Sequence, residues 1–328
     1  MKTGCSRLRR IGAFLLAAVM LALGSACGKA PEGPLHGYQI EENTNSENKI
    51  SYPYVVRTES ATWYLAQADI DLMGEDAFYE GLDSILQVQD ADFADARARL
   101  SGYIWDEIPP IDIYTDFGGN ADISESAGAY YHRGRNFIKV FTGWDTTRWT
   151  LLHEYVHYLT RHCTDDPVQS GFFAEGIAEY IAMIACRDRM LRGLYPDTGA
   201  EEVSFLKSRG AWDEEEDCFD PLRYFTGLAE VYARGVMVGE EFYSTQDISL
   251  VRTEEIQQNP TPETVSHAEA AAIMAYLVET YSQDFVFSHL SMSTDEFETV
   301  YGEPFSAVYE HWAAWNAARC SELGLSFG

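Results

Sequence analysis

The sequence predicts an α+β fold, in which a small N-terminal sheet with a helix precedes a mainly helical C-terminal lobe. Short runs of β-branched and aromatic residues are concentrated before residue 145, and apolar residues recur at helical spacing after it. Of the 328 residues, 46% are apolar, which is enough to bury a large core. We therefore expect one large domain or two lobes in close contact.

The N-terminus, residues 1–26, is typical of an export signal rather than of a folded element. Basic residues precede an apolar run, Ile11 to Leu23, which is too short to span a bilayer comfortably. The small residues before Cys27 resemble a bacterial lipobox, and this resemblance implies lipid attachment at Cys27 on the outer face of a bacterial membrane, at the cell surface or in the periplasm. An ordinary secretory signal is the alternative. Residues 27–52 contain Pro, Asn and Glu with little apolar content, which predicts a flexible tether.

The N-terminal lobe, residues 53–145, begins with β-branched and aromatic residues and continues with helical spacing. A Pro109-Pro110 pair then ends any helix, and strand-like alternation follows. The predicted elements are one or two strands within 53–66, a helix over about 75–103, a strand at 111–114, and a hairpin formed by 129–131 and 137–141.

The C-terminal lobe, residues 146–328, has four clear helical patterns, of which the one at Gly171 to Tyr180 is described below. One covers the segment around residues 150–159, one follows His267, and one is an amphipathic helix after Pro304. Four cysteines, Cys163, Cys186, Cys218 and Cys320, lie in this lobe. In an exported protein they would form two disulfides, with buried thiols as the alternative.

The net charge is -29, from 23 basic and 52 acidic residues. Such a surface repels polyanions, so a nucleic-acid partner is excluded.

The segment that carries chemistry is His153-Glu154-Tyr155-Val156-His157. Histidines four residues apart on a helix project from one face, with Cβ atoms about 5 to 6 Å apart, and can share one metal ion. Glu154 lies beside them, where it can reach a metal-bound water. This is the HExxH arrangement of zinc peptidases.

A third protein ligand is needed. Metzincins take a His six residues after the second one, and that position is Cys163 here, so that class is excluded. A second helical segment, Gly171 to Tyr180, instead places Glu175 and Glu179 one turn apart on a face distinct from its apolar stripe.

At these residues the chain resembles the gluzincins, a group of zinc peptidases. The resemblance implies a zincin-like fold and one Zn²⁺ held by His153, His157 and Glu175. It implies that Glu179 orients a ligating histidine and that Glu154 is the general base. It also implies an oxyanion donor from the C-terminal lobe, for which His267 is the candidate and Tyr232 and Tyr243 are alternatives. An edge strand would bind the substrate backbone, and we place it at Ala127, Gly128, Ala129 and Tyr130.

The sequence therefore predicts a lipid-anchored zinc metallopeptidase that acts on peptides or proteins outside the cytoplasm. The segment with which aminopeptidases hold a free amine is absent, which favours an endopeptidase. One alternative is a catalytically silent pseudo-peptidase that binds a protein or peptide partner. A second is a lipid-anchored solute-binding protein, which would need two α/β lobes.

Overall fold

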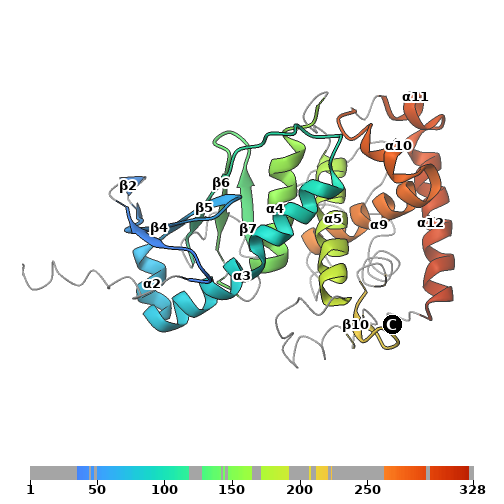
Figure 1. Ribbon diagram of the computed structural model, residues 1–328. Coiled ribbons are helices and arrows are strands. Elements are labelled where there is room, and N and C mark those ends of the chain that lie inside the picture. The colour runs from blue at the N-terminus through green and yellow to red at the C-terminus, as the bar shows by residue number, and fades with distance from the viewer. Residues whose placement is uncertain are drawn as a thin grey trace, which may run out of the picture.

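A computed structural model describes residues 35–43, 46–47, 50–117, 128–141, 143–144, 147–164, 171–191, 207, 212–220, 223, 262–292 and 296–324. Over these residues the fold is mixed α/β, with a six-stranded sheet and eight helices. Figure 1 shows the sheet at one end of the molecule and the helices of the C-terminal half at the other.

The six strands of the main sheet are β1 (Ile40–Glu42), β4 (Tyr54–Arg57), β5 (Ala61–Leu65), β6 (Ile111–Thr115), β7 (Ala129–His132) and β8 (Phe137–Val140). Two small ribbons are formed by β2 (Ser46–Glu47) with β3 (Ile50–Ser51), and by β9 (Trp212–Asp213) with β10 (Cys218–Phe219). The helices are α2 (Gln67–Met73), α3 (Glu75–Arg99), α4 (Thr147–Thr160), α5 (Gly171–Leu191), α9 (Pro262–Tyr281), α10 (Gln283–Phe287), α11 (Phe297–Tyr301) and α12 (Phe305–Glu322). The elements predicted between residues 53 and 141 and the helix after Pro304 are confirmed. The helix predicted after His267 is present, but it begins earlier, at Pro262, so His267 lies inside it.

The main sheet has the strand order β1-β4-β5-β6-β8-β7. β5, β6 and β8 run parallel, whereas β7 is antiparallel to β8 and forms one edge of the sheet. Strands β5 and β6 alternate buried and half-buried residues. Their buried side chains, including Trp63 and Ile113, belong to the same core as Phe78 and Leu82 of α3. One face of the sheet is therefore closed by α3.

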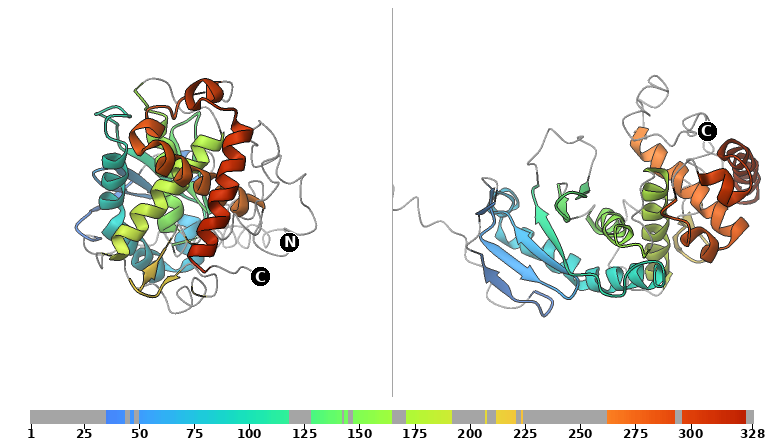
Figure 2. Two further views of the ribbon diagram at one scale, coloured as in Figure 1. Left: turned by 90° about the vertical axis from the view of Figure 1, so that its right-hand side faces the viewer. Right: turned by 90° about the horizontal axis from the view of Figure 1, so that it is seen from above.

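The helical half is built around α4, α5 and α9. Figure 2 shows α3 running from beneath the sheet toward α5, with α4 between the sheet and the other helices. Gly176 of α5 lies so close to α9 that an added Cβ would be 2.9 Å from the carbonyl oxygen of Ala270. This close approach of two backbones requires a residue without a side chain.

The predicted tether is too long, because part of it belongs to the sheet. Residues 40–42 form β1 and pair with β4 in the register Ile40↔Val56 to Glu42↔Tyr54. Just before β1, Leu35 is buried and the Tyr38 hydroxyl donates to Asp90 of α3 at 2.5 Å. The sequence of this segment resembles a solvated linker because β1 lies at an exposed edge of the sheet and has polar side chains. Residues 1–34, including Cys27, lie outside the described residues.

The prediction of two disulfides is wrong. The structure records Cys163, Cys186, Cys218 and Cys320 as buried thiols, which is the alternative raised by the sequence. They behave as small apolar residues of the core.

Among the helices that the structure describes, each is too short or too polar to cross a bilayer.

Candidate metal centre

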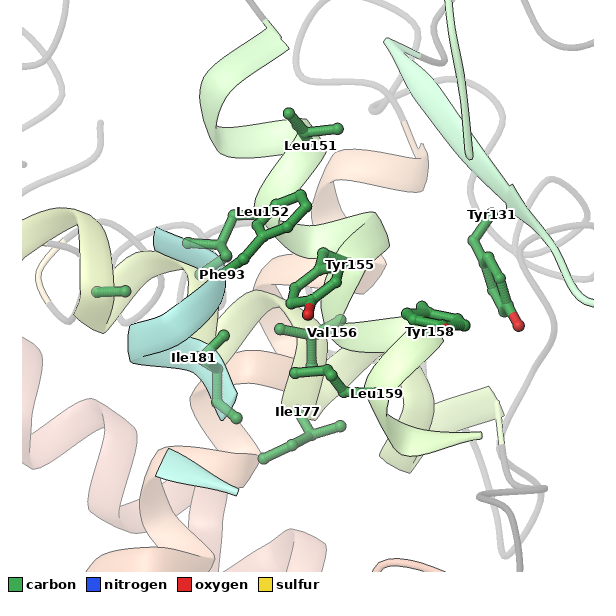
Figure 3. Close-up of a cluster of buried hydrophobic side chains, with 14 of the residues drawn as sticks. Phe93, Tyr131, Leu151, Leu152, Tyr155, Val156, Tyr158, Leu159, Ile177 and Ile181 are labelled. Atoms are coloured by element: carbon green, nitrogen blue, oxygen red, sulfur yellow. The ribbon is translucent and has the colours of Figure 1, made fainter. Parts of the chain in front are cut away.

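Helix α4 is fixed in rotation by its apolar face. The Tyr155 ring stacks on Phe93 of α3, with ring centroids 3.6 Å apart. Val156 and Leu159 are fully buried and belong to the same cluster as Ile177 of α5 (Figure 3). Because one face of α4 is held on these neighbours, the imidazoles on another face have a defined direction.

His153 and His157 lie one turn apart on α4, and their Nε2 atoms are 3.0 Å apart. Helix α5 brings Glu175 to the same point. Its Oε2 lies 3.2 Å from Nε2 of His153 and 3.1 Å from Nε2 of His157. The three residues that the sequence predicts as metal ligands are therefore brought together by two packed helices.

Helix α9 adds a third imidazole to this point. Nε2 of His267 lies 3.2 Å from Oε2 of Glu175, and the ring centroid of His267 is 5.4 Å from that of His153. Ligand atoms of His153, Glu175 and His267 all lie within 4.8 Å of one another, a spacing at which they could hold a metal ion. The sequence placed His267 in the site, and the structure puts it against the same carboxylate oxygen as the HExxH histidines.

Glu179 lies one turn after Glu175 on α5, with its Oε2 3.6 Å from Nδ1 of His153. A carboxylate at this position favours the tautomer in which Nδ1 carries the proton. In the neutral ring, Nε2 of His153 is then an unprotonated lone pair directed at the Glu175 carboxylate, whereas in the protonated ring it donates to that carboxylate.

These contacts fit a bound cation. A lone pair of His153 facing both a carboxylate oxygen and another imidazole nitrogen is repulsive unless a proton or a metal ion lies between them. In a tetrahedral zinc site with bonds of about 2.0 to 2.1 Å, the ligand atoms are about 3.3 Å apart. The separations of 3.0, 3.1 and 3.2 Å among His153, His157 and Glu175 are close to that value. Two imidazoles and a carboxylate are also a donor set that Zn²⁺ prefers.

The electrostatics of the site favour positive charge. Burial alone would lower the pKa of His153, but the carboxylates of Glu179 and Glu175 hold it well above its usual range. Burial would raise the pKa of Glu175, yet His157, His153 and His267 hold that pKa well below its usual range. A buried site that stabilises a proton on imidazole and a negative carboxylate would also stabilise a cation between them.

Glu154 is buried on α4 and is held by the edge strand. Its Oε2 accepts a hydrogen bond of 2.7 Å from the backbone N–H of Tyr131 in β7. Burial raises the pKa of Glu154, an effect partly offset by His153 and His157. The carboxyl group therefore has a fixed orientation and a raised pKa.

The backbone contact from Tyr131 is the feature that sequence reasoning missed. The N–H of Phe141 donates to the carbonyl of Gly128, so the backbone N–H groups of Tyr130 and His132 also point toward β8. The backbone N–H of the intervening Tyr131 therefore points away from β8. The alternation of residues in the hairpin indicates which backbone N–H groups point away from β8, but the sequence does not show which edge of the sheet α4 approaches.

The remaining predicted residues are placed as follows. Gly128, Ala129 and Tyr130 lie at or in the edge strand β7, beside α4. Ala127, Tyr232 and Tyr243 lie outside the described residues.

Comparisons of the chain with models of known protein families, with curated proteins and with solved structures find no match.

Proposed function

We propose that the chain is a zinc-dependent peptidase of gluzincin type with a zincin-like fold. The observation that carries the proposal is the convergence of His153 and His157 with Glu175 at separations of 3.0 to 3.2 Å, beside a buried Glu154. The donor set and its spacing fit one Zn²⁺. When bound, the metal would polarise a carbonyl group and make water more acidic.

Glu154 would accept a proton from the attacking water and pass it to the leaving amine. The hydrogen bond from the backbone N–H of Tyr131 occupies one lone pair of Oε2 of Glu154 and so limits rotation of the carboxyl group. General base catalysis depends on this kind of fixed orientation, because the base must meet the proton in the transition state.

His267 would donate a hydrogen bond to the oxyanion that develops on the substrate carbonyl. Burial would lower its pKa, but the Glu175 carboxylate raises that pKa above the ordinary histidine value. The protonated ring that this favours is the form that donates from both nitrogens.

An extended peptide would bind along β7 by adding a strand to the sheet edge. The partners are then peptides or proteins, and an endopeptidase is favoured. Export and attachment to the membrane through a lipid at Cys27 belong to the same proposal and rest on the sequence of the N-terminus.

Metal analysis and peptide cleavage test the proposal. Purified protein should contain about one equivalent of zinc and cleave members of a peptide library. Glu154→Gln should lower kcat by about 10²- to 10⁴-fold with unchanged zinc content, because only the proton acceptor is lost. Glu310→Gln, at an exposed position of α12, is the matched control and should leave both values unchanged.

Absence of bound zinc after loading would refute the proposal. Zinc without cleavage by the wild-type protein would instead support the pseudo-peptidase that binds a partner.

A further inference from the structure

The point at which His153, His157 and Glu175 meet has a fourth protein donor, the Nε2 atom of His267. It lies 3.2 Å from Oε2 of Glu175, the same separation as that of His153 from this oxygen. Three imidazoles therefore contact one carboxylate oxygen, and ligand atoms of His153, Glu175 and His267 lie within 4.8 Å of one another. A zinc site with four protein ligands is closed, whereas a catalytic site keeps one position for water or substrate.

The packing of α9 on α5 explains why His267 lies here. Gly176 directly follows Glu175, and Ala270 lies one turn after His267. The Cβ that Gly176 lacks would be 2.9 Å from the Ala270 carbonyl oxygen, so the two backbones are near contact at this turn. Glu175 and His267 therefore project from the closest approach of the two helices, and the backbone packing holds them together.

His267 is also the most exposed of the three histidines. Its side chain is 19% exposed, against 8% for His153 and 11% for His157, while Glu175 is 31% exposed. Solvent reaches the site from the side of Glu175 and His267. Rotation of the His267 side chain would open this side without disturbing the pair on α4.

We propose that His267 is a fourth, exchangeable metal ligand, which completes the donor set when no substrate is bound and leaves it when a substrate carbonyl or water takes its place. This inference rests on the proposed zinc site and deepens it. In this proposal the site is closed when no substrate is bound, and a substrate must displace His267 to open it. His267 is then a metal ligand before displacement and a hydrogen-bond donor to the oxyanion afterwards.

X-ray absorption at the zinc edge tests the proposal, because it counts the imidazoles bound to the metal. The zinc-loaded wild-type protein should show three imidazoles, and His267→Ala should show two together with an added water. Zinc affinity should fall by at least about tenfold in His267→Ala. Free imidazole should restore the third imidazole by filling the space left by the side chain.

Two further variants control the result. His267→Gln keeps a polar side chain of similar size and should also show two imidazoles, which guards against loss of folding in His267→Ala. His289→Ala removes a histidine whose Nδ1 contacts the carbonyl of Phe285, away from the site. This variant should still show three imidazoles bound to zinc.

Two imidazoles in both the wild-type protein and His267→Ala would overturn this inference and leave the proposed peptidase standing. Failure of the wild-type protein to bind zinc would overturn both.

Discussion

Two carboxylates with many polar partners, Asp90 of α3 and Glu175 of α5, are surrounded by different kinds of group. Asp90 accepts from the Tyr38 hydroxyl at 2.5 Å, from the Thr58 hydroxyl at 2.9 Å and from the Gln89 amide at 3.0 Å. The hydroxyl and backbone N–H of Ser60 also donate to it. Each of these partners brings its own proton.

The partners of Glu175 are imidazole nitrogens, and two of them face each other as closely as they face the carboxylate. Burial would raise the pKa of Asp90, but donors from Ser60, Tyr38 and Thr58 lower it below its usual value, so its cluster is complete as it stands. The Glu175 cluster is completed by positive charge, either from protons on its imidazoles or from the metal ion proposed above. The type of partner, rather than the number of contacts, therefore separates the structural carboxylate of Asp90 from the proposed ligand Glu175.

The largest expected effect is on the response to zinc. Zinc at about 1,000 times its dissociation constant should raise the free energy of unfolding of the wild-type protein by about 4 kcal/mol. Glu175→Gln should lose most of this gain, whereas Asp90→Asn should keep it, as measured by thermal unfolding with zinc and with a chelator. A full zinc response in Glu175→Gln would place the metal elsewhere.

Asp90→Asn should lower the free energy of unfolding by about 2 to 4 kcal/mol, equally with zinc and with chelator, because several donors lose a charged acceptor. The pKa of Asp90 is lowered in the folded state, so its stabilisation is present above the unfolded pKa of about 4 and is lost as the pH falls further. The difference in the free energy of unfolding between the wild-type protein and Asp90→Asn, measured by urea titration, should therefore become smaller in acid. Glu80→Ala, at an exposed position of α3, should change stability by less than about 0.5 kcal/mol.

Asp69 of α2 is a buried carboxylate whose pKa is shifted in the opposite direction to that of Asp90. Burial raises its pKa to about 7, although Thr115 and the backbone of Phe117 donate to it. The folded protein keeps a proton that the unfolded chain releases, so this residue makes stability fall as the pH rises from about 4 to about 7. Asp69→Asn should remove that part of the pH dependence and raise the free energy of unfolding by about 2 kcal/mol at pH 8. Urea titrations that find the variant less stable than wild type at pH 8 would contradict this.

Gly176→Ala should have the smallest effect. A Cβ at 2.9 Å from a backbone oxygen forces a shift that costs about 1 to 3 kcal/mol, and the better helix propensity of Ala offsets up to about 1 kcal/mol. The net loss should be about 1 kcal/mol, with weaker zinc binding because α9 moves relative to α5. Gly134→Ala in the β7–β8 turn meets only the His132 side chain, at 3.3 Å, and is the control. A stabilised Gly176→Ala protein would mean that the helices can separate without cost.

The local part of the site could be predicted from the sequence, because helical spacing alone puts His153, Glu154 and His157 on neighbouring positions of one helix. The same spacing identified Glu175 and Glu179 and the helix after His267. Strand and helix positions between residues 53 and 141 followed from alternation, Pro and Gly.

Contacts between distant segments were not predictable in this way. Tyr38 and Asp90 are 52 residues apart, and Tyr131 and Glu154 are 23 apart, so no local period connects them. Strand β1 was missed because an edge strand with polar side chains resembles a linker. The cysteines were misjudged because their number suits disulfides, whereas the tertiary packing buries them as thiols.

The positions of the donors along the chain also set the order in which the site is completed during folding. We expect His153 and His157 to come together when α4 forms, Glu175 to join when α5 docks, and His267 to join last, because α9 is the most distant of the three helices in sequence. A metal ion captured early would favour docking of the later helices, because each adds a donor. With the zinc site proposed above, the supply of zinc would then influence how fast the C-terminal half reaches its native packing.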